Sequence, residues 1–548
     1  MVEQVEQIES YNVIKGFLNL VVKDQYWIEF LQDINSQTNY GQQATNGEKV
    51  MVEFSSPNTN KPLHLGHIRN ILLGWSTSRI LEAAGYEVVR VQIVNDRGIA
   101  ICKSMLAWEQ FGEGETPNSS GIKSDHFVGK YYVLFEKKFQ EEYKKWQQSE
   151  QGQAILNDKQ KEGQDEAAFF KAYKNTYFNE YSELGKEAKA MLLKWEEGEE
   201  TTIALWKKMN NWVYEGFDIT YDNLGVHFDK LYYESDTYLL GKKTIEKGLE
   251  SDIFYRKDDQ SIWIDLEDAK LDHKLVLRSD GTSVYMTQDI GTAQLRYADY
   301  GVNKMVYVVA DEQNYHFKVL FEIMKRLGEP YAEGMHHLSY GMVDLPSGRM
   351  KSREGTVVDA DDLMAEVIEE ARSNSSERGT LIDLSQEEQA NIIRMIGLAA
   401  LKYFIIRVNP QKRMTFDPKE SVDMQGQTGP YIQNAYVRIQ SVLRKAGEAD
   451  LGEAKNYTTL EAQEKDIILQ LFEFPNVIQT AAKDFDPSAV AAFCYDLAKS
   501  YHKFYHDLQI LKAPTPEAKA FRLMLSTELA NVLKFGMDLL GIEMPHKM

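Results

Sequence analysis

The sequence lacks most features of a secreted, membrane-bound or metal-stabilised protein. Cys102 and Cys494 are the only cysteines in 548 residues, so neither a disulfide framework nor a structural zinc site is supported. We expect both to be buried small hydrophobic residues. No apolar run approaches the roughly 20 residues that cross a bilayer, and the acidic start, Met1 to Glu6, is unlike a secretory signal. These absences predict a cytoplasmic protein without a membrane partner or a bound structural metal.

Two further absences limit the function. The net charge of -21 excludes a protein that coats nucleic acid indiscriminately, because such binding depends on Lys and Arg neutralising phosphates. It does not exclude one specific nucleic acid, since local basic groups are enough for that. Such groups gather in one late segment, namely Lys402, Arg407, Lys412, Arg413, Arg438, Arg444 and Lys445. The phosphate loop Gly-x-x-x-x-Gly-Lys-Ser/Thr is missing from the sequence, which excludes an ordinary P-loop NTPase.

The first half of the chain predicts an α+β piece followed by an α/β domain. The length is too great for one hydrophobic core, so several domains are expected. Residues 1–48 predict a strand from Val13 to Val22 and a helix from Gln25 to Ile34. From residue 49 the pattern becomes strand, helix and strand, over Val50 to Phe54, His67 to Ala84 and Val88 to Val94. This is a βαβ unit with parallel strands.

The second half of the chain predicts a return to α/β structure and then an all-helical end. Residues 104–216 are rich in Glu, Lys, Gln, Trp and Tyr and predict a mostly helical insertion with a solvated charged face. A helix from Asp289 to Tyr300 and a strand from Lys304 to Ala310 then restore the sheet. After residue 358 the pattern is helical, with a bundle beginning near Ser385. We therefore predict a Rossmann-like parallel-sheet domain over 49–384 and a helical domain over 385–548.

A short motif lies at the junction of the first strand and its helix. His64-Leu65-Gly66-His67 sets two imidazoles three residues apart at the positive end of a helix. A triphosphate can be held there, and Gly66 leaves room for a base. The motif predicts an ATP site; the alternative is a helix start with two incidental histidines.

The motif and its flanks resemble the arginyl-tRNA synthetases, which are class I aminoacyl-tRNA synthetases. Five segments agree in order from about Glu53 to the last residue, with a diverged patch between about Ser104 and Thr202. The resemblance implies that arginine is activated with ATP and Mg²⁺ and then joined to the 3′ end of tRNA(Arg). It also implies anticodon binding by residues 385–548 and tRNA-elbow contact by residues 1–48, which are short for the family. We expect a monomer.

On the ATP side, the resemblance gives His64 and His67 the role of phosphate and transition-state contacts. Gly66 lies under the adenine, and Met342 is a further ATP contact. Catalysis of this step is mostly positioning and stabilisation of phosphate charge, so histidines and lysines suffice.

The family's second signature, a lysine-bearing loop, is matched imperfectly by residues 349–356, Arg-Met-Lys-Ser-Arg-Glu-Gly-Thr. Ser352 occupies the position of the catalytic second lysine. The charge must then come from Arg349, Lys351, Arg353 or another residue. Lys61 is the favoured candidate, because arginyl enzymes without the loop lysine commonly carry a lysine just before the histidine motif; a plain surface lysine is the alternative.

Selection of arginine requires acceptors for a guanidinium fork and for an α-ammonium group. Glu53 and Asn58 resemble the family's contacts to the amino end of the substrate. Tyr285 and Asp289 are four residues apart and share a helix face if that segment is helical; Asp289 is the expected guanidinium partner. Gln313 matches the remaining amide. Without the resemblance, each would more often be a helix cap or a surface residue.

The helical domain resembles the family's anticodon-binding domain from about Asp423 to Ile439. Unpaired bases are held by aromatic rings and arginine planes, so Tyr431 and Arg438 are expected to read the anticodon loop. Tyr505 and Met548 match two further contacts, and Asn434 stands where an aromatic residue is frequent. Aromatic residues at helical spacing are more often core, which is the alternative for Tyr505 and its neighbours.

Three other functions are alternatives to the arginine–tRNA ligase that the resemblance implies. A synthetase for another amino acid disagrees with the acidic pocket, and a nucleotidyltransferase without tRNA leaves the helical third unexplained. A catalytically silent relative that binds tRNA as a scaffold is supported only by the missing loop lysine. Asp96, at the end of the second strand, is a secondary site candidate, with a turn-forming residue as its alternative.

Overall fold

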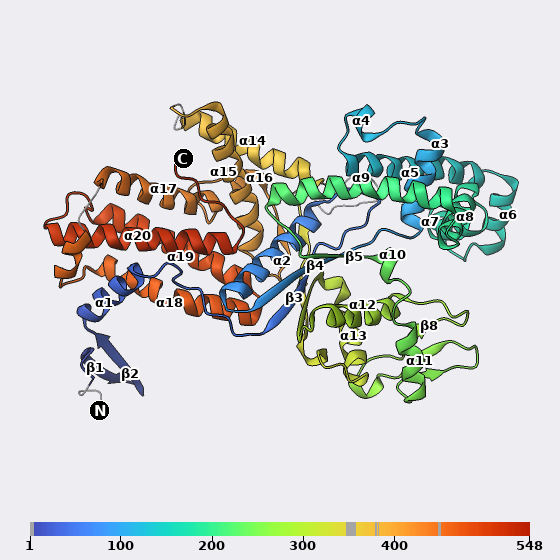
Figure 1. Ribbon diagram of the computed structural model, residues 1–548. Coiled ribbons are helices and arrows are strands. Elements are labelled where there is room, and N and C mark those ends of the chain that lie inside the picture. Colours follow the sequence, from blue (N-terminus) through green and yellow to red (C-terminus); the bar gives the residue numbers. More distant parts are fainter. Residues whose placement is uncertain (1–4, 347–357, 379–380, 382, 448–450) are drawn as a thin grey trace.

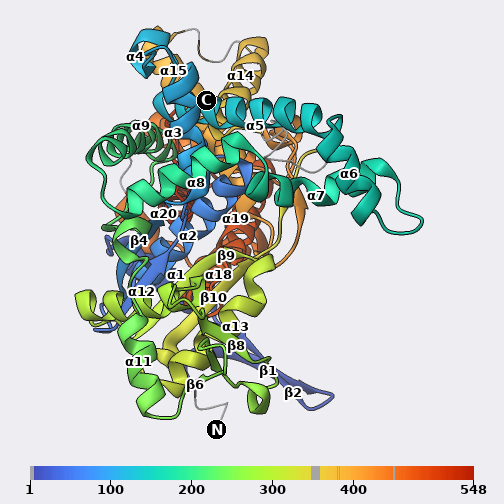
Figure 2. The same cartoon turned by 90° about the vertical axis from the view of Figure 1, so that its right-hand side faces the viewer.

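The computed structural model describes residues 5–346, 358–378, 381, 383–447 and 451–548. The predicted signature loop over 349–356 therefore lies outside the described residues. Figure 1 shows a parallel sheet in the middle of an elongated molecule, with one helical lobe beside it and a helical bundle on the other side. The turned view in Figure 2 shows helices on both faces of that sheet.

Among the described residues, five strands form the parallel sheet in the spatial order β10-β9-β3-β4-β5. Their bounds are β3 (Lys49–Glu53), β4 (Glu87–Val94), β5 (Lys230–Tyr233), β9 (Lys304–Ala310) and β10 (Met335–Tyr340). From β3 the chain passes to β4 on one side and later returns as β9 on the other. Ligands of open α/β sheets bind at such a reversal, outside the carboxyl ends of the strands. The predicted Rossmann-like parallel sheet is confirmed.

The two faces of the sheet are buried by different parts of the chain. Val50 and Val52 of β3 belong to the hydrophobic core shared with α2 (Leu65–Ala83) and the helical bundle. Met51, between them, belongs to a second core with α12 (Tyr285–Tyr300) and α13 (Asn314–Arg326). Successive strand residues point to opposite faces, so β3 is covered on both sides, as in other buried parallel sheets.

The helical insertion lies between β4 and β5 and is helical as predicted, although it is longer than residues 104–216. Its helices are α3 (Ile99–Phe111), α4 (Pro117–Ser120), α5 (Ser124–Gln147), α6 (Glu150–Lys159), α7 (Glu166–Glu180), α8 (Glu183–Glu196) and α9 (Glu200–Leu224). After β5 come two short helices, α10 (Glu234–Thr237) and α11 (Lys242–Glu250), and an antiparallel sheet of β6 (Tyr255–Arg256), β7 (Ile262–Ile264) and β8 (Lys274–Leu277). Strands of this length carry too little periodicity to be predicted from sequence.

The described chain after Val358 is mostly helical, as expected. Its α-helices are α14 (Ala360–Arg378), α15 (Gln386–Ile406), α16 (Pro418–Ser421), α17 (Gly429–Ala446), α18 (Ala462–Asp484), α19 (Pro487–Asp507) and α20 (Pro516–Leu539). Ser385 caps α15 through reciprocal bonds with Glu388. Two short strands, β11 (Val343–Asp344) and β12 (Met414–Thr415), pair in parallel and join the sheet domain to this part.

One expectation about hydrophobic segments needs correction. By length and composition α15 is apolar enough to cross a membrane, with a mean hydropathy of 1.3 over its most apolar window. Two thirds of that window, 67%, is buried inside the protein, where α15 packs against α2, α14 and α17. The core helix of a soluble protein passes the same test of length and composition, and α15 is buried like such a helix.

The N-terminal piece is built differently from the prediction. Val13 to Val22 is not one strand: β1 (Ile8–Ile14) and β2 (Phe17–Val22) form an antiparallel hairpin. Lys15 and Gly16 turn the chain with φ values of 49° and 85°, which suits a two-residue hairpin turn. The predicted helix from Gln25 to Ile34 is confirmed as α1 (Asp24–Asn35). Cys102 and Cys494 are buried, as expected.

Candidate active site

The loop after β3 is held in an unfavourable backbone conformation. Ser55 and Ser56 have φ values of 72° and 45°, and each such residue outside glycine costs about 1–3 kcal/mol. The Ser55 amide donates to Asn70 Oδ1 of α2 over 2.5 Å, and the Ser55 hydroxyl lies 2.7 Å from the Tyr221 hydroxyl of α9. These bonds from two helices fix the path between Glu53 and the histidine motif, so the loop is preorganised.

The ring of each histidine accepts a backbone amide at the start of α2. His64 is the N-cap; its Nδ1 accepts from the Gly66 amide at 3.1 Å, and His67 Nδ1 accepts from the His64 amide at 3.1 Å. Burial lowers the pKa of His64 to about 4 and that of His67 well below its usual value, and Lys61 lowers both further. Both rings are therefore neutral at pH 7. Since Nδ1 accepts, the proton is on Nε2, which remains a donor.

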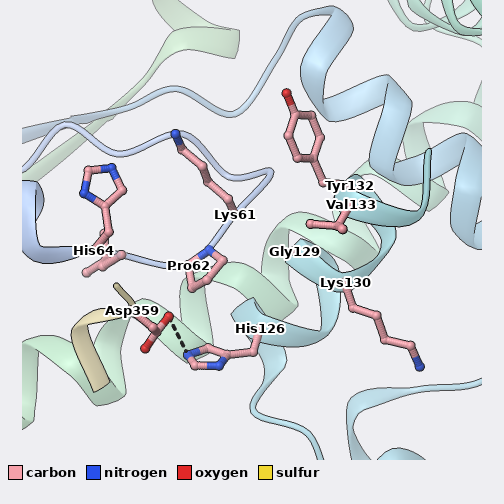
Figure 3. A pocket seen from close by; sticks show the side chains of 10 residues that line it. Lys61, Pro62, His64, His126, Gly129, Lys130, Tyr132, Val133 and Asp359 are labelled. Atoms are coloured by element: carbon pink, nitrogen blue, oxygen red, sulfur yellow. Dashed lines mark ion pairs between the residues drawn. The ribbon is translucent and has the colours of Figure 1, made fainter. Parts of the chain in front are cut away.

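A cavity of about 220 Å³ lies beside His64. It is bounded by the loop before α2, by α5 of the insertion and by Asp359, through the residues Lys61, Pro62, Leu63, His64, His126, Gly129, Lys130, Tyr132, Val133 and Asp359. In Figure 3, Lys61 and the His64 ring extend to the same side of their loop, and α5 forms the facing wall. The structure thus brings Lys61 close to the histidine motif.

An acidic segment that sequence reasoning missed closes the base of this cavity. The chain at residues 358–360 runs antiparallel to the histidine loop: the Leu65 amide donates to the Val358 carbonyl over 3.2 Å and the Ala360 amide to the Leu63 carbonyl over 3.0 Å. His126 Nε2 lies 3.3 Å from Asp359 Oδ2, the contact drawn in Figure 3.

A second carboxylate completes this cluster. His126 Nε2 lies 3.0 Å from Asp361 Oδ2, and Lys123 Nζ lies 2.5 Å from the same oxygen. Bonding to Asp359 and Asp361 raises the pKa of His126 to about 10, so this imidazole is a cation at pH 7. Asp125, His126 and Asp361 have a spacing that could hold a metal ion, but the Lys123 ammonium already supplies a cation to them. None of these residues lies in a motif that could have identified it.

Glu53 is engaged inside the protein, which the sequence did not predict. Its Oε2 forms an ion pair with Nη1 of Arg296, a buried residue of α12, and its Oε1 accepts from the Ser56 hydroxyl at 3.3 Å. The Arg296 guanidinium lies 5.2 Å and 5.7 Å from the ring centroids of Tyr232 and Tyr307. Within the described part of the chain, its Nε and Nη2 have no hydrogen-bond partner.

Glu53 and Asp289 line one cavity, as predicted, but it is small. Its volume is about 50 Å³, well below the roughly 300 Å³ at which ligand pockets begin. The other lining residues are Ile93, Thr292, Arg296, Tyr307, Phe317 and Leu320. Asp289 Oδ2 is paired with His316 Nε2 at 2.6 Å. Internal partners therefore occupy the two carboxylates predicted to hold arginine.

The other predicted arginine contacts lie outside that lining. The segment of Tyr285 and Asp289 is helical, as required, and Tyr285 begins α12 with 80% of its surface exposed. Asn58 and Gln313 are also exposed. Asn58 forms a parallel bridge with Asn95 of the next strand's end, and Gln313 precedes α13. Asn58 and Gln313 follow β3 and β9 of the parallel sheet, whereas Tyr285 follows β8 of the antiparallel sheet.

Glu234 is a further acidic residue that sequence reasoning missed. It follows β5 directly. Burial raises its pKa to about 7, Asp96 and Asp289 raise it, and Arg97 lowers it. The Asp289 charge acts on this carboxyl, but Glu234 does not line the small cavity of Glu53 and Asp289. A four-residue strand before it gives no sequence signal.

Asp96 has a structural role at the end of β4. It is buried, and its carboxylate accepts from the Ser235 amide at 2.9 Å, the Ser235 hydroxyl at 2.8 Å and the Tyr214 hydroxyl at 3.1 Å. These bonds join the ends of β4 and β5 to α9. These partners lie far along the chain, so the bonds of the Asp96 side chain differ from those of a turn-forming residue, and its secondary site role stays a prediction.

Four other residues are predicted at the ATP site. Lys351 and Arg353 lie outside the described residues. Met342 lies between β10 and β11, and its carbonyl accepts from Arg69 Nη1 at 3.2 Å. Gly66 is in the first turn of α2, with the His64 ring 3.0 Å from the position of an added Cβ. A larger residue at 66 would push the first histidine aside.

A second candidate site lies on the helical bundle. The Arg438 guanidinium of α17 lies 5.1 Å from the Tyr505 ring centroid of α19. Both line a cavity of about 320 Å³ with Ser441, Val442, Lys445, Leu508, Gln509, Ile510, Leu511 and Lys512. Tyr505 is exposed, whereas Tyr501 and Phe504 are buried. Tyr501 and Phe504 are therefore core residues, whereas the Tyr505 ring is accessible to a ligand.

Three predicted anticodon contacts are not in that lining. Tyr431 packs against Tyr495 and His502, with ring centroids 5.3 and 4.9 Å away. Asn434 lies one turn later on α17 and is partly buried. Met548 packs against the hydrophobic cluster of α14 and α15. The C-terminus nevertheless approaches α17, because Arg444 Nη1 donates to the His546 carbonyl over 3.1 Å.

Comparisons with known proteins agree with this arrangement. Residues 30–417 match the model of the class I tRNA synthetase (R) catalytic domain, and residues 432–548 match the DALR anticodon binding domain. Arginine–tRNA ligases of Phocaeicola vulgatus and Parabacteroides distasonis are 53% and 52% identical over 99% of this chain and 88% of their own length. The solved arginyl-tRNA synthetase of Thermus thermophilus covers 99% of this chain, and the chain covers 89% of it, with a TM-score of 0.78 at 24% identity. The chain therefore belongs to the arginine–tRNA ligases, the arginyl branch of the class I aminoacyl-tRNA synthetases.

Proposed function

We propose that the crevice between β3 and β9 activates L-arginine with ATP and transfers it to tRNA(Arg). His64 and His67 donate hydrogen bonds to the phosphates of ATP in this proposal. The observation that carries this assignment is that Nδ1 of each ring accepts a backbone amide, from Gly66 for His64 and from His64 for His67. It fixes both imidazoles in the neutral form with Nε2–H outward of the backbone bonds, at the positive end of α2. Neutral donors fixed before ATP binds stabilise developing phosphate charge without reorganising. Mg²⁺ would enter as the partner of ATP.

Lys61 is proposed to replace the missing loop lysine. It lines the same cavity as His64, and its charge lowers the pKa of both histidines, after burial. An ammonium at that position attracts phosphate as a point charge. Lys351 and Arg353 remain proposed contributors from the signature loop, and Gly66 and Met342 are the proposed contacts to the rest of ATP.

Asp289 and Glu234 are proposed to hold the arginine guanidinium. Two carboxylates can accept from both sides of its planar fork; Asp289 lines the small cavity and its charge acts on Glu234. Glu53 and Asn58 are proposed for the α-ammonium, with Tyr285 and Gln313 completing the site. Since Arg296 holds Glu53 Oε2, the proposed contact is Oε1, which now accepts from the Ser56 hydroxyl at 3.3 Å.

The helical part is proposed to bind the anticodon loop. The Arg438–Tyr505 pair is the strongest contact candidate, because it combines a cation with an exposed ring in one cavity. Tyr431, Asn434 and Met548 are proposed as neighbouring contacts. We further propose domain limits at residues 48 and 384, a cytoplasmic location and a monomer.

ATP–pyrophosphate exchange and aminoacylation test this proposal together. The purified chain is assayed with arginine, lysine and citrulline, each with and without tRNA(Arg). We expect exchange and arginyl-tRNA formation with arginine when tRNA is present. Binding of tRNA(Arg) without either reaction would instead support the scaffold function and refute the catalytic roles.

A further inference from the structure

A buried arginine lies two residues beyond the histidine motif. Arg69 of α2 is 0% exposed, and its guanidinium donates to three backbone carbonyls of other segments. Nη1 reaches Met342 at 3.2 Å, and Nη2 reaches Pro410 at 3.2 Å and Lys412 at 2.8 Å. All three acceptors are neutral, so Arg69 forms no ion pair through them. Its bonds instead join the start of α2 to two distant parts of the chain.

Both segments that flank residues 347–357 are attached to the start of α2. Met342 comes before them and is held by Arg69. Val358 and Ala360 come after them and are bonded to Leu65 and Leu63. The positions from which the signature loop departs and to which it returns are therefore both set by one helix start.

The other two carbonyls connect this region to the helical part. Pro410 and Lys412 lie between α15 and β12. The Gly341 amide donates to the Pro410 carbonyl over 2.9 Å, and the Met414 amide donates to the Met342 carbonyl over 3.1 Å. The backbones are close: a Cβ on Gly341 would lie 2.7 Å from Arg413 N.

The chemistry of this junction requires a guanidinium. A planar fork has several donors in fixed directions, which one ammonium cannot reproduce. Removing it leaves the Lys412 carbonyl without its donor and leaves the Met342 and Pro410 carbonyls with one backbone amide each, and a buried carbonyl is costly to leave unpaired. The junction then relaxes, and the Met342 backbone moves relative to Gly66 and the histidines.

We propose that Arg69 is a positioning residue for ATP: it holds the Met342 backbone, braced by the segment after α15, at a fixed distance from the histidine motif. This inference rests on the proposed function, in which Met342 and Gly66 contact ATP. Arginine contacts come from other elements, namely the end of β3, α12 and the segment after β5. The inference therefore separates the two substrates: loss of Arg69 weakens ATP and spares arginine.

The test is ATP–pyrophosphate exchange by Arg69→Met and Arg69→Lys at saturating tRNA(Arg). We expect the KM for ATP to rise by about tenfold or more in Arg69→Met, because displacements near 1 Å in a site cost up to about 100-fold. The KM for arginine should stay within about twofold, since additivity holds for sites without shared partners. The rise in melting temperature on adding ATP should shrink in parallel, and Arg69→Lys should be intermediate.

Two further variants make the result decisive. Arg79→Met is the matched control, because Arg79 is on the same helix and pairs with Asp538 of α20 away from the ATP side; its KM for ATP should stay at the wild-type value. Gly341→Ala pushes the two backbone segments of this junction apart while Arg69 is unchanged. Its KM for ATP tests the inference if Arg69→Met does not fold. An unchanged KM for ATP in both, or equal rises for ATP and arginine, overturns the inference. An inactive wild-type chain would instead refute the proposed function.

Discussion

Replacing Asp289 by Asn tests the arginine pocket most directly. The substitution keeps the size of the side chain and an acceptor for His316, but it removes the charge that would face the guanidinium. A hydrogen bond between charged groups contributes about 1.5–3 kcal/mol, which corresponds to a rise of about 10- to 150-fold in the KM for arginine. Because 37% of the Asp289 side chain is exposed, solvent screening places the expected rise in the lower half of that range.

The assay is arginine-dependent exchange at saturating ATP and tRNA, with the KM for ATP measured beside it. The KM for ATP should not change, since Asp289 is not in the lining of the His64 cavity. Asp299→Asn is the matched control: Asp299 is on the same helix and accepts from the Tyr232 hydroxyl at 2.8 Å. Equal arginine kinetics in the wild type and Asp289→Asn would show that the guanidinium lies elsewhere.

Two other predictions concern the ATP side. Lys61→Ala should lower kcat for exchange by about 10-fold or more, as expected for a lost charge at the phosphates, without changing the melting temperature. Lys49→Ala, at the opposite end of β3, is the control and should leave kcat unchanged. An unchanged kcat in Lys61→Ala would return the role to the signature loop. His126→Gln tests the cluster with Asp359 and Asp361. The folded pKa of His126 is raised to about 10, so its contribution to stability is complete below about pH 6.5 and lost as pH rises through 10. The variant should therefore lose more unfolding free energy at pH 6 than at pH 10 in urea melts, and equal losses at both would contradict the ion pairs.

The sequence predicts the parts of this fold that depend on local pattern. Strand β9 has the predicted bounds because Lys304 to Ala310 is a continuous apolar run closed by polar residues. The histidine motif is predictable because its two rings and Gly66 act within one helical turn. The hairpin at Lys15 and Gly16 was not predicted because most of β1 is polar, with Glu9, Ser10 and Asn12, so the apolar pattern starts at Val13 and continues across the turn.

The partners of the site residues could not be predicted in the same way. Arg296 and Arg69 are far in sequence from the groups they bind, and each looks like an ordinary helical arginine until the tertiary fold exists. His126 lies within the long insertion and Glu234 follows a short strand, and neither element carries a motif. Local chemistry thus predicted candidate ligand contacts, and only the fold revealed the residues that hold those candidates in place.

The carboxylates proposed for the arginine site already have internal partners, and this bears on how arginine would be selected. Asp289 contacts His316 Nε2, and Glu53 is bound to Arg296, which itself carries a guanidinium. We therefore predict that arginine displaces groups of the protein instead of binding free carboxylates. A neutral analogue such as citrulline brings no cation to Asp289, and it leaves that carboxylate short of one at a cost of about 1–3 kcal/mol or more. Discrimination is then expected from the cost of an incomplete exchange, which falls on the wrong substrate.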